Sequence, residues 1–249
     1  MLRAPDLRFD TEKRAIAIVG QLVENAPSLV FHLRTSFREQ MVRAAERYSS
    51  GSEKPCKDER ELIDRLVDTT DEIYSDLGMH LGNVGILASV IAQELKNNGH
   101  KVDPGLSYKG GAIHDIGKLD PLIYHLVSFP GKLGPTQKET TKLHTDIGYK
   151  VLTKFDIPDK TALFALQHHE RLNGTGYPQG LSDKDLSLET RVVTVADAVD
   201  AMMQDRPGRE GKSVPDILKE LVKGVGTHFD ERVVEAYLRI CKKLGYPEL

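Results

Sequence analysis

Apolar residues recur at helical spacing along most of the chain. Between residues 10 and 45 they include Ile16, Val19 and Val23, spaced as on one face of an α-helix. The same spacing predicts further helices over residues 59–74, 80–97, 106–114, 136–155, 160–168, 188–203, 214–222 and 230–244. Strand signals are scarce, because the β-branched stretch at 192–195 leads straight into an alanine-rich helical pattern. We therefore expect an all-α fold, a helical bundle with a helical N-terminal extension.

A polar segment that contains Gly51 and Pro55 follows the first helical stretch, and this composition is typical of a linker. We expect residues 1–71 to form a helical N-terminal region and residues 72–249 to form a compact helical domain. The amphipathic helices of the first region fit a cap that completes the core. They fit equally a regulatory region, or one that pairs two copies into a homodimer, and we favour this second interpretation.

The chain has 249 residues, of which 39% are hydrophobic and 29% charged, as in an ordinary soluble globular protein. We expect no membrane span, and the charged residues among positions 1–10 do not resemble a secretory signal. The two cysteines, Cys56 and Cys241, form no CxxC pair, which favours a reducing, cytoplasmic location. The net charge of -3 gives no reason to expect general nucleic-acid binding. An anionic substrate would therefore require locally clustered positive charge.

Histidines and aspartates stand at positions that suit metal binding. A His-Asp pair and a His-His pair each follow an apolar helical stretch. Asp197 lies inside the apolar run 193–199, where a buried carboxylate needs a partner. Asp76 precedes His80 by four residues, so both side chains would fall on one helix face. The candidate ligands, in chain order, are Asp76, His80, His114, Asp115, His144, His168, His169 and Asp197.

This set of side chains favours a particular chemistry. Imidazole and carboxylate ligands without thiolates suit divalent iron, manganese, zinc, nickel or cobalt. The ligands outnumber what one metal ion takes from a protein, so they predict at least two ions, a recurring device for hydrolysis of phosphate esters. Taken singly, each signal has an ordinary explanation, such as a helix cap for the His-His pair or a structural carboxylate for Asp197. Together, on a helical scaffold, they favour a metal-dependent phosphodiesterase.

Several motifs resemble those of the HD-GYP domain, a branch of the HD phosphohydrolase superfamily. The resemblance implies an all-α domain that binds two or three divalent metal ions, iron or alternatively manganese. It also implies hydrolysis of a cyclic dinucleotide, chiefly cyclic di-GMP, to linear dinucleotide, GMP or both, in bacterial signalling. The similar segments lie between residues 75 and 234, at 114–118 (HDIGK), 168–171 (HHER), 174–178 (GTGYP), 191–197 (RVVTVAD), 205–209 (DRPGR) and 229–230 (FD).

The resemblance also implies roles for individual residues. Asp115 and Lys118 would be catalytic, with Lys118 in contact with the scissile phosphate. Arg206 and Arg209 would bind the substrate phosphates, and Tyr177 would stack on or border a guanine. The metal ligands implied are His80, His114, Asp115, His144, His168, His169 and Asp197, with Asp76 where family members with three metals carry a glutamate.

Two other functions remain open. The first is a different HD-type hydrolase that acts on nucleotides or another small phosphate ester; the Gly176-Tyr177-Pro178 motif and the double histidine argue against it. The second is a sensor that binds the cyclic dinucleotide with little or no turnover. The complete ligand set argues against a sensor, because a pure binding module does not need it.

Overall fold

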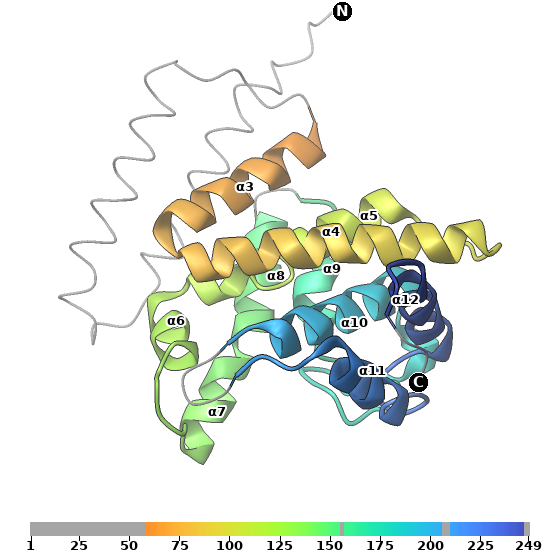
Figure 1. The fold of residues 1–249 in the computed structure, drawn as a ribbon. Coiled ribbons are helices and arrows are strands. Elements are labelled where there is room, and N and C mark those ends of the chain that lie inside the picture. The colour runs from red at the N-terminus through yellow and green to blue at the C-terminus, as the bar shows by residue number, and fades with distance from the viewer. Residues whose placement is uncertain (1–57, 155–156, 206–209, 247–249) are drawn as a thin grey trace, which may run out of the picture.

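The computed structural model describes residues 58–154, 157–205 and 210–246, which form helices joined by loops (Figure 1). In this part of the chain there is no β-strand, only isolated bridges, and no helix is both long and apolar enough to cross a bilayer. The all-α prediction is confirmed. The helices are α3 (Glu59–Ile73), α4 (Ser75–Asn97), α5 (Pro104–Ile113), α6 (Pro121–Val127), α7 (Pro135–Lys142), α8 (His144–Lys154), α9 (Asp159–Gln167), α10 (Leu188–Met203), α11 (Val214–Lys223) and α12 (Glu231–Lys243), with short 3-10 helices η2 (Ile116–Leu119) and η3 (Asp183–Asp185).

The predicted linker and the helices before it lie outside the described residues, so their role stays a prediction. The described chain begins just before α3, where the side chain of Asp58 accepts hydrogen bonds from the backbone of the first turn, as N-cap residues do. The buried Ile63 of α3 packs into the same hydrophobic cluster as Leu81 of α4. The helix α3 also spans the boundary predicted at residue 71, and this boundary stays a prediction.

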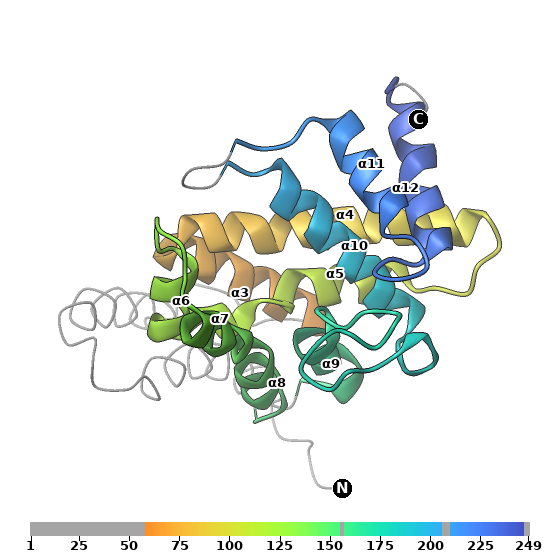
Figure 2. The same ribbon diagram turned by 90° about the horizontal axis from the view of Figure 1, so that it is seen from below.

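The helix α4 is the central element of the fold. Its first half contributes Leu81 to a hydrophobic cluster with α3, α5, α8 and α9. Its second half contributes Ile91 to a second cluster with α10, α11 and α12. Figure 2 shows α3 on one side of α4 and both α11 and α12 on the other. Each fully buried leucine or isoleucine contributes roughly 1.5–3 kcal/mol, so burial on both flanks fixes α4 between the two clusters.

The helix α10 occupies the predicted residues 188–203. Its N-cap is Ser187, whose hydroxyl accepts a hydrogen bond from the backbone N–H of Thr190. Val192, Val193 and Val195 are fully buried. Although β-branched residues favour strands, these three pack into the core from a helix. The same helix carries Asp197, whose side chain is only partly buried.

The helical prediction over residues 136–155 is wrong in one respect, because this stretch forms two helices. The first, α7, ends at Lys142, and its C-cap Leu143 keeps helical backbone angles. No glycine or proline marks the break. The change of direction makes His144 the first residue of α8. The short helix α6 was not predicted, although Asp120 at its N-cap and Pro121 at its first position are ordinary start signals.

The turn that follows α5 lies directly against the start of α8. A Cβ atom on Gly117 would overlap the carbonyl oxygen of His144. Only a glycine permits this approach of η2 to α8 without displacing the backbone. The contact brings Asp115, which immediately precedes η2, beside His144.

Candidate metal centre

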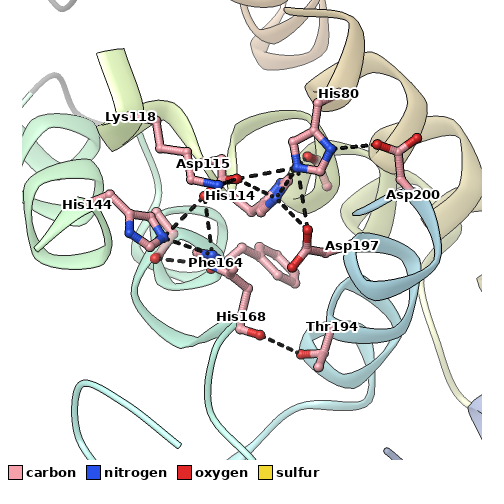
Figure 3. Close-up of polar contacts among 12 residues, drawn as sticks. His80, His114, Asp115, Lys118, His144, Phe164, His168, Thr194, Asp197 and Asp200 are labelled. Carbon is pink, nitrogen blue, oxygen red and sulfur yellow. Dashed lines mark hydrogen bonds and ion pairs between the residues drawn. The ribbon is translucent and has the colours of Figure 1, made fainter. Parts of the chain in front are cut away.

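The predicted histidine and aspartate ligands from His80 onward converge on one place in the interior. Figure 3 shows six of them pointing toward one another from α4, α8, α10 and the turns that end α5 and α9. They form two groups, in each of which one potential ligand atom per residue lies within 4.8 Å of the others. The carboxylate-rich group is His80, His114, Asp115 and Asp197; the histidine-rich group is Asp115, His144, His168 and His169.

Asp115 belongs to both groups, with one oxygen on each side. Its Oδ2 atom lies 3.3 Å from Nε2 of His80 and 3.3 Å from Nε2 of His114. Its Oδ1 atom lies 3.2 Å from Nε2 of His144 and 3.4 Å from Nε2 of His168. The side chain is 1% exposed, and Oδ1 is buried without a hydrogen bond to any described residue. A buried carboxylate oxygen in this state is costly unless a cation satisfies it.

The orientation of the imidazole rings also favours a cation at this place. Nδ1 of His114 donates to the carbonyl oxygen of Gly111 at 2.7 Å, and Nδ1 of His144 donates to that of Thr141 at 2.6 Å. Nδ1 of His168 lies 3.0 Å from the carbonyl oxygen of Phe164. Because a carbonyl oxygen only accepts, Nδ1 carries the proton of a neutral ring, and the lone pair of Nε2 points into the site.

Such lone pairs face each other across the site. The Nε2 atoms of His144 and His168 are 3.3 Å apart, and those of His80 and His114 are 3.2 Å apart. Two lone pairs at this distance repel unless a proton or a metal ion lies between them. The donor set therefore fits a divalent metal centre, with imidazole and carboxylate ligands and no thiolate.

The two groups differ in electrostatics. In the carboxylate-rich group, burial opposes the charged forms, but the contacts with Asp115 and Asp197 raise the pKa of both His80 and His114. The pKa of Asp197 is held well below its usual range despite burial, because these two histidines contact it. In the histidine-rich group, burial lowers the pKa of His168 to about 4.

Asp197 is less buried than its apolar surroundings in the sequence predicted. Its side chain is 16% exposed, whereas Val195 and Ala196, which precede it in α10, are fully buried. Its Oδ1 atom lies 3.4 Å from Nε2 of His80 and 3.6 Å from Nε2 of His114. The residue is therefore accessible from outside while remaining a ligand candidate.

Two of the residues predicted to act on substrate, Lys118 and Tyr177, border this centre. Nζ of Lys118 donates to Oδ2 of Asp115 (Figure 3), while 21% of the lysine side chain stays exposed. The ring of Tyr177 lies against that of His169 in a tilted arrangement, with centroids 4.7 Å apart and planes 30° apart. Lys142 lies over the same tyrosine ring, its Nζ 5.2 Å from the centroid. The Tyr177 ring, which was predicted to stack on or border a guanine, is therefore already in contact with one aromatic ring and one cation of the protein.

Sequence reasoning missed Asp200, which is buried beside the carboxylate-rich group. Its Oδ2 atom accepts a hydrogen bond from Nδ1 of His80 at 2.6 Å (Figure 3), and Oδ1 accepts one from Asn83 at 3.1 Å. This carboxylate fixes which imidazole nitrogen of His80 faces the site. The available signal was its position three residues after Asp197 in α10, which places the two on one helix face.

The loop between α9 and η3 is held by another carboxylate whose role was not predicted. Glu170 is 1% exposed and accepts hydrogen bonds from the backbone N–H groups of Gln179 at 2.7 Å and Leu181 at 3.0 Å. A Cβ on Gly176 would overlap the backbone of Glu170, so this glycine lets the loop fold back closely. The result places Tyr177 against His169.

Asp76 is the one predicted ligand in the described part of the chain that lies outside the centre. Asp76 is exposed on the first turn of α4 and belongs to neither ligand group. Its role as a ligand of a third metal stays a prediction. Arg206 and Arg209 lie outside the described residues, and their contact with substrate phosphates stays a prediction as well.

Comparison with known proteins identifies related chains. A cyclic di-GMP phosphodiesterase of Thermotoga maritima is 34% identical over 167 residues, which are 66% of this chain and 45% of the relative. A cyclic di-GMP phosphodiesterase response regulator of Xanthomonas campestris pv. campestris is 33% identical over 183 residues, 73% of this chain and 48% of the relative. The chain thus spans about half the length of these curated relatives.

The fold also has solved counterparts. The structure of Bd1817, a HDG"Y"P protein from Bdellovibrio bacteriovorus, aligns with a TM-score of 0.53 and 20% identity, covering 91% of this chain and 77% of that one. At this identity the likeness concerns the fold alone. A family model for the HD domain matches residues 84–233, more than half of the chain. The superfamily predicted from the motifs is confirmed, and this chain belongs to the HD domain family.

Proposed function

We propose that this chain is a metal-dependent phosphodiesterase that hydrolyses a cyclic dinucleotide, first of all cyclic di-GMP, to the linear dinucleotide, GMP or both. The observation that carries the proposal is Asp115, whose two oxygens face two different sets of histidines. A carboxylate shared in this way can hold two metal ions close enough to act on one phosphate. The Thermotoga and Xanthomonas relatives, both cyclic di-GMP phosphodiesterases by name, support the substrate class.

We assign one divalent ion, iron or manganese, to each ligand group. Imidazole and carboxylate donors suit both ions. When bound, such ions supply Lewis acidity and lower the pKa of water. A third ion would need Asp76, which is exposed one helical turn before His80, to reach toward the centre.

The protein side chains would hold and neutralise the phosphate. Lys118 already donates to Asp115 and is partly exposed, so it can also donate to an oxygen of a phosphate bound beside Asp115. Such charge-assisted hydrogen bonds stabilise the charge that develops during cleavage. Burial, together with Asp115 and Asp197, raises the pKa of Tyr177, so its hydroxyl stays protonated and remains a hydrogen-bond donor at neutral pH.

We infer that this reaction takes place in the cytoplasm. Cys241 is a free, buried thiol, which fits a reducing compartment. A homodimer through the N-terminal helices remains our expectation for residues 1–71. Both ligand groups are complete within one described chain, so the site is compatible with either a monomer or a dimer.

The test is an assay of the protein loaded with iron or manganese under anaerobic conditions. The substrates are cyclic di-GMP, 3′,3′-cyclic GMP-AMP, cyclic di-AMP and GTP. His114→Ala removes a ligand of the carboxylate-rich group, and His125→Ala, an exposed histidine of α6, is the matched control. We expect turnover of a cyclic dinucleotide by the wild type and by the control, and its loss in His114→Ala.

Other outcomes would redirect the assignment. Hydrolysis of GTP without cleavage of any cyclic dinucleotide would indicate another HD-type hydrolase. Tight binding of a cyclic dinucleotide by the metal-loaded protein without turnover would indicate a sensor. Full activity of His114→Ala would exclude the metal centre from the reaction.

A further inference from the structure

The outer face of α4 has the composition of a surface that another helix covers. Exposed, uncharged residues follow one another along it at alternate spacings of four and three positions: Met79, Asn83, Ile86, Val90, Gln93 and Asn97. Ile86 is 60% exposed and Val90 is 44% exposed. A surface helix ordinarily carries charged residues on its solvent side, and a row with this spacing is typical of helices that pack side by side. We call this row the α4 seam.

A hollow runs beside the α4 seam. It has a volume of about 410 Å³ and lies between α4, α10 and α12. Among the described residues that line it, Asp200 alone is charged. Its rim includes the exposed side chains of Met203 in α10 and of Leu244 and Tyr246 after α12, and Leu244 is 71% exposed. One face of the molecule therefore offers both an apolar ridge and an apolar hollow, as a self-complementary surface requires.

The two ends of the α4 seam differ in charge. Asp71 and Asp76 are exposed at its start. Near its end, Arg239 and Lys243 of α12 both pair with one carboxylate, that of Glu94, so cations are in excess there. Two antiparallel copies would bring the acidic end of each against the basic end of the other, whereas two parallel copies would bring like charges together. The charges therefore favour a second, antiparallel copy of this chain as the partner.

We propose that two copies of this chain pair through the α4 seam, antiparallel and about a twofold axis. In this register Met79 lies opposite the partner's Val90, and Asn83 lies opposite the partner's Ile86, because both pairs are centred on the middle of the seam. An asparagine in such a row fixes the register of two helices. The surface lies outside residues 1–71, and the pairing does not depend on the proposed function.

The same register covers the hollow. Leu244 follows α12, which contacts α4 at Glu94, near the end of the seam. Met203 lies in α10, which contacts α4 at Asn83, near the start of the seam. An antiparallel arrangement brings the end of one seam to the start of the other. Leu244 of one copy therefore comes to the rim beside Met203 of the other, and each copy covers apolar surface of its partner.

The oligomeric state of the full chain tests the pairing. We expect sedimentation equilibrium to show a dimer and Val90→Arg to raise its dissociation constant roughly 100-fold or more, because each dimer would bury the new charge twice. Val222→Arg on α11 is the matched control, since Val222 is 45% exposed and belongs neither to the seam nor to the lining of the hollow. The control should keep the wild-type dissociation constant, and circular dichroism should show that both variants are folded.

Disulfide crosslinking tests the orientation. A mixture of Met79→Cys and Val90→Cys chains should form an intermolecular disulfide between these two positions, which non-reducing peptide mass spectrometry identifies. Neither variant should link to itself through the new cysteine. In an antiparallel pair, the two copies of either position lie about 16 Å apart along the helices, which is eleven residues at about 1.5 Å each and is beyond the reach of a disulfide.

Four outcomes would overturn the proposal. The first is a wild type that stays monomeric throughout the micromolar range, and the second is a dimer that Val90→Arg leaves unchanged, which would place the interface elsewhere, such as in residues 1–71. The third is self-linking of either single cysteine variant, which would indicate parallel pairing. The fourth is a monomer whose melting temperature Val90→Arg lowers and Val222→Arg does not, which would show that another segment of the same chain covers the seam. None of these measurements uses turnover, so failure of the proposed function would leave them unaffected.

Discussion

The two ligand groups share Asp115 but are built differently. The carboxylate-rich group adds Asp197 to two histidines, whereas the histidine-rich group has three histidines and no second carboxylate. The first therefore places two negative charges around its centre and the second places one. The pKa values of His80 and His114 are raised. Protons bound to these two rings therefore offset the negative charge of the first group, as a divalent ion would.

The supports behind the ligands differ as well. His114, His144 and His168 are each oriented by a backbone carbonyl oxygen three or four residues earlier in the chain, which no side-chain substitution removes. His80 is oriented by the carboxylate of Asp200, which is distant in the sequence, and the ring of His169 contacts that of Tyr177. The backbone therefore fixes the orientation of some histidine rings, whereas other rings depend on neighbouring side chains that a substitution can change.

The largest effect should come from Asp115, the residue that the groups share. In Asp115→Ala we expect both groups to lose their metal ions and turnover to fall by roughly 10³-fold or more, since several kcal/mol of charge stabilisation disappear. Elemental analysis of the purified protein and a kinetic assay measure this, with His125→Ala as the control. Retention of two ions and of activity would show that the groups do not depend on a shared carboxylate.

Much of this centre could be predicted from the sequence because its ligands stand at helix ends or inside strongly periodic helices. His114 and Asp115 follow an apolar helix, and Asp197 lies in the well-marked α10. Each local pattern has an ordinary explanation by itself, and only their combination indicated these residues as candidate ligands. The family match over residues 84–233 agrees with that interpretation.

What could not be predicted depends on contacts between distant parts of the chain. Asp200 bonds to His80 across 120 positions, and no local pattern indicates such a pair. The break between α7 and α8 also lacks a local signal, since Leu143 keeps helical backbone angles. It arises where η2 packs against α8, through Gly117 and the His144 carbonyl.

Removing one ligand from each group should separate the two ions. Asp197→Asn weakens the carboxylate-rich group, and His169→Ala weakens the histidine-rich group. We expect each variant to retain about one ion instead of about two and to lose roughly 100-fold in turnover. With cobalt as the probe, the absorption spectra of the two variants should differ and together reproduce that of the wild type. Loss of both ions in either variant would show that the groups bind metal as one unit.

Asp200 tests whether the side-chain support is specific to one group. In Asp200→Asn the hydrogen bond to His80 can persist, but the negative charge is lost. We expect metal affinity of the carboxylate-rich group to fall about 10- to 100-fold, as for other outer carboxylates, with the histidine-rich group unchanged. A chelator competition titration measures this. Asn83→Ala removes a neutral partner of Asp200 and should have a smaller effect; an equal effect would contradict the importance of the charge.

The smallest effect should come from the link between the two groups outside the centre. Arg191 of α10, the helix that carries Asp197, bonds to the carbonyl oxygens of Asp183 and Leu186 in the loop that follows His169. Its Nη1 atom also donates a hydrogen bond to Oδ2 of Asp230, at 2.7 Å. This network therefore joins a helix of the carboxylate-rich group to a loop of the histidine-rich group.

The acid dependence of this link follows from the pKa of Asp230. Burial opposes the charged carboxylate, but Arg232 and Arg191 lower its pKa to about 2. A lowered folded-state pKa stabilises the protein above the unfolded value near 4 and loses that effect as the pH falls toward 2. Asp230→Asn keeps an oxygen that can accept at the N-cap of α12, so the variant tests the charge alone. We expect it to lower the free energy of unfolding by about 1 kcal/mol at pH 7, a value discounted for solvent screening. Urea unfolding of wild type and variant should show this difference shrinking by about half at pH 3. A difference that stays constant between pH 7 and pH 3 would show that the ionised carboxylate does not hold the helix and the loop together.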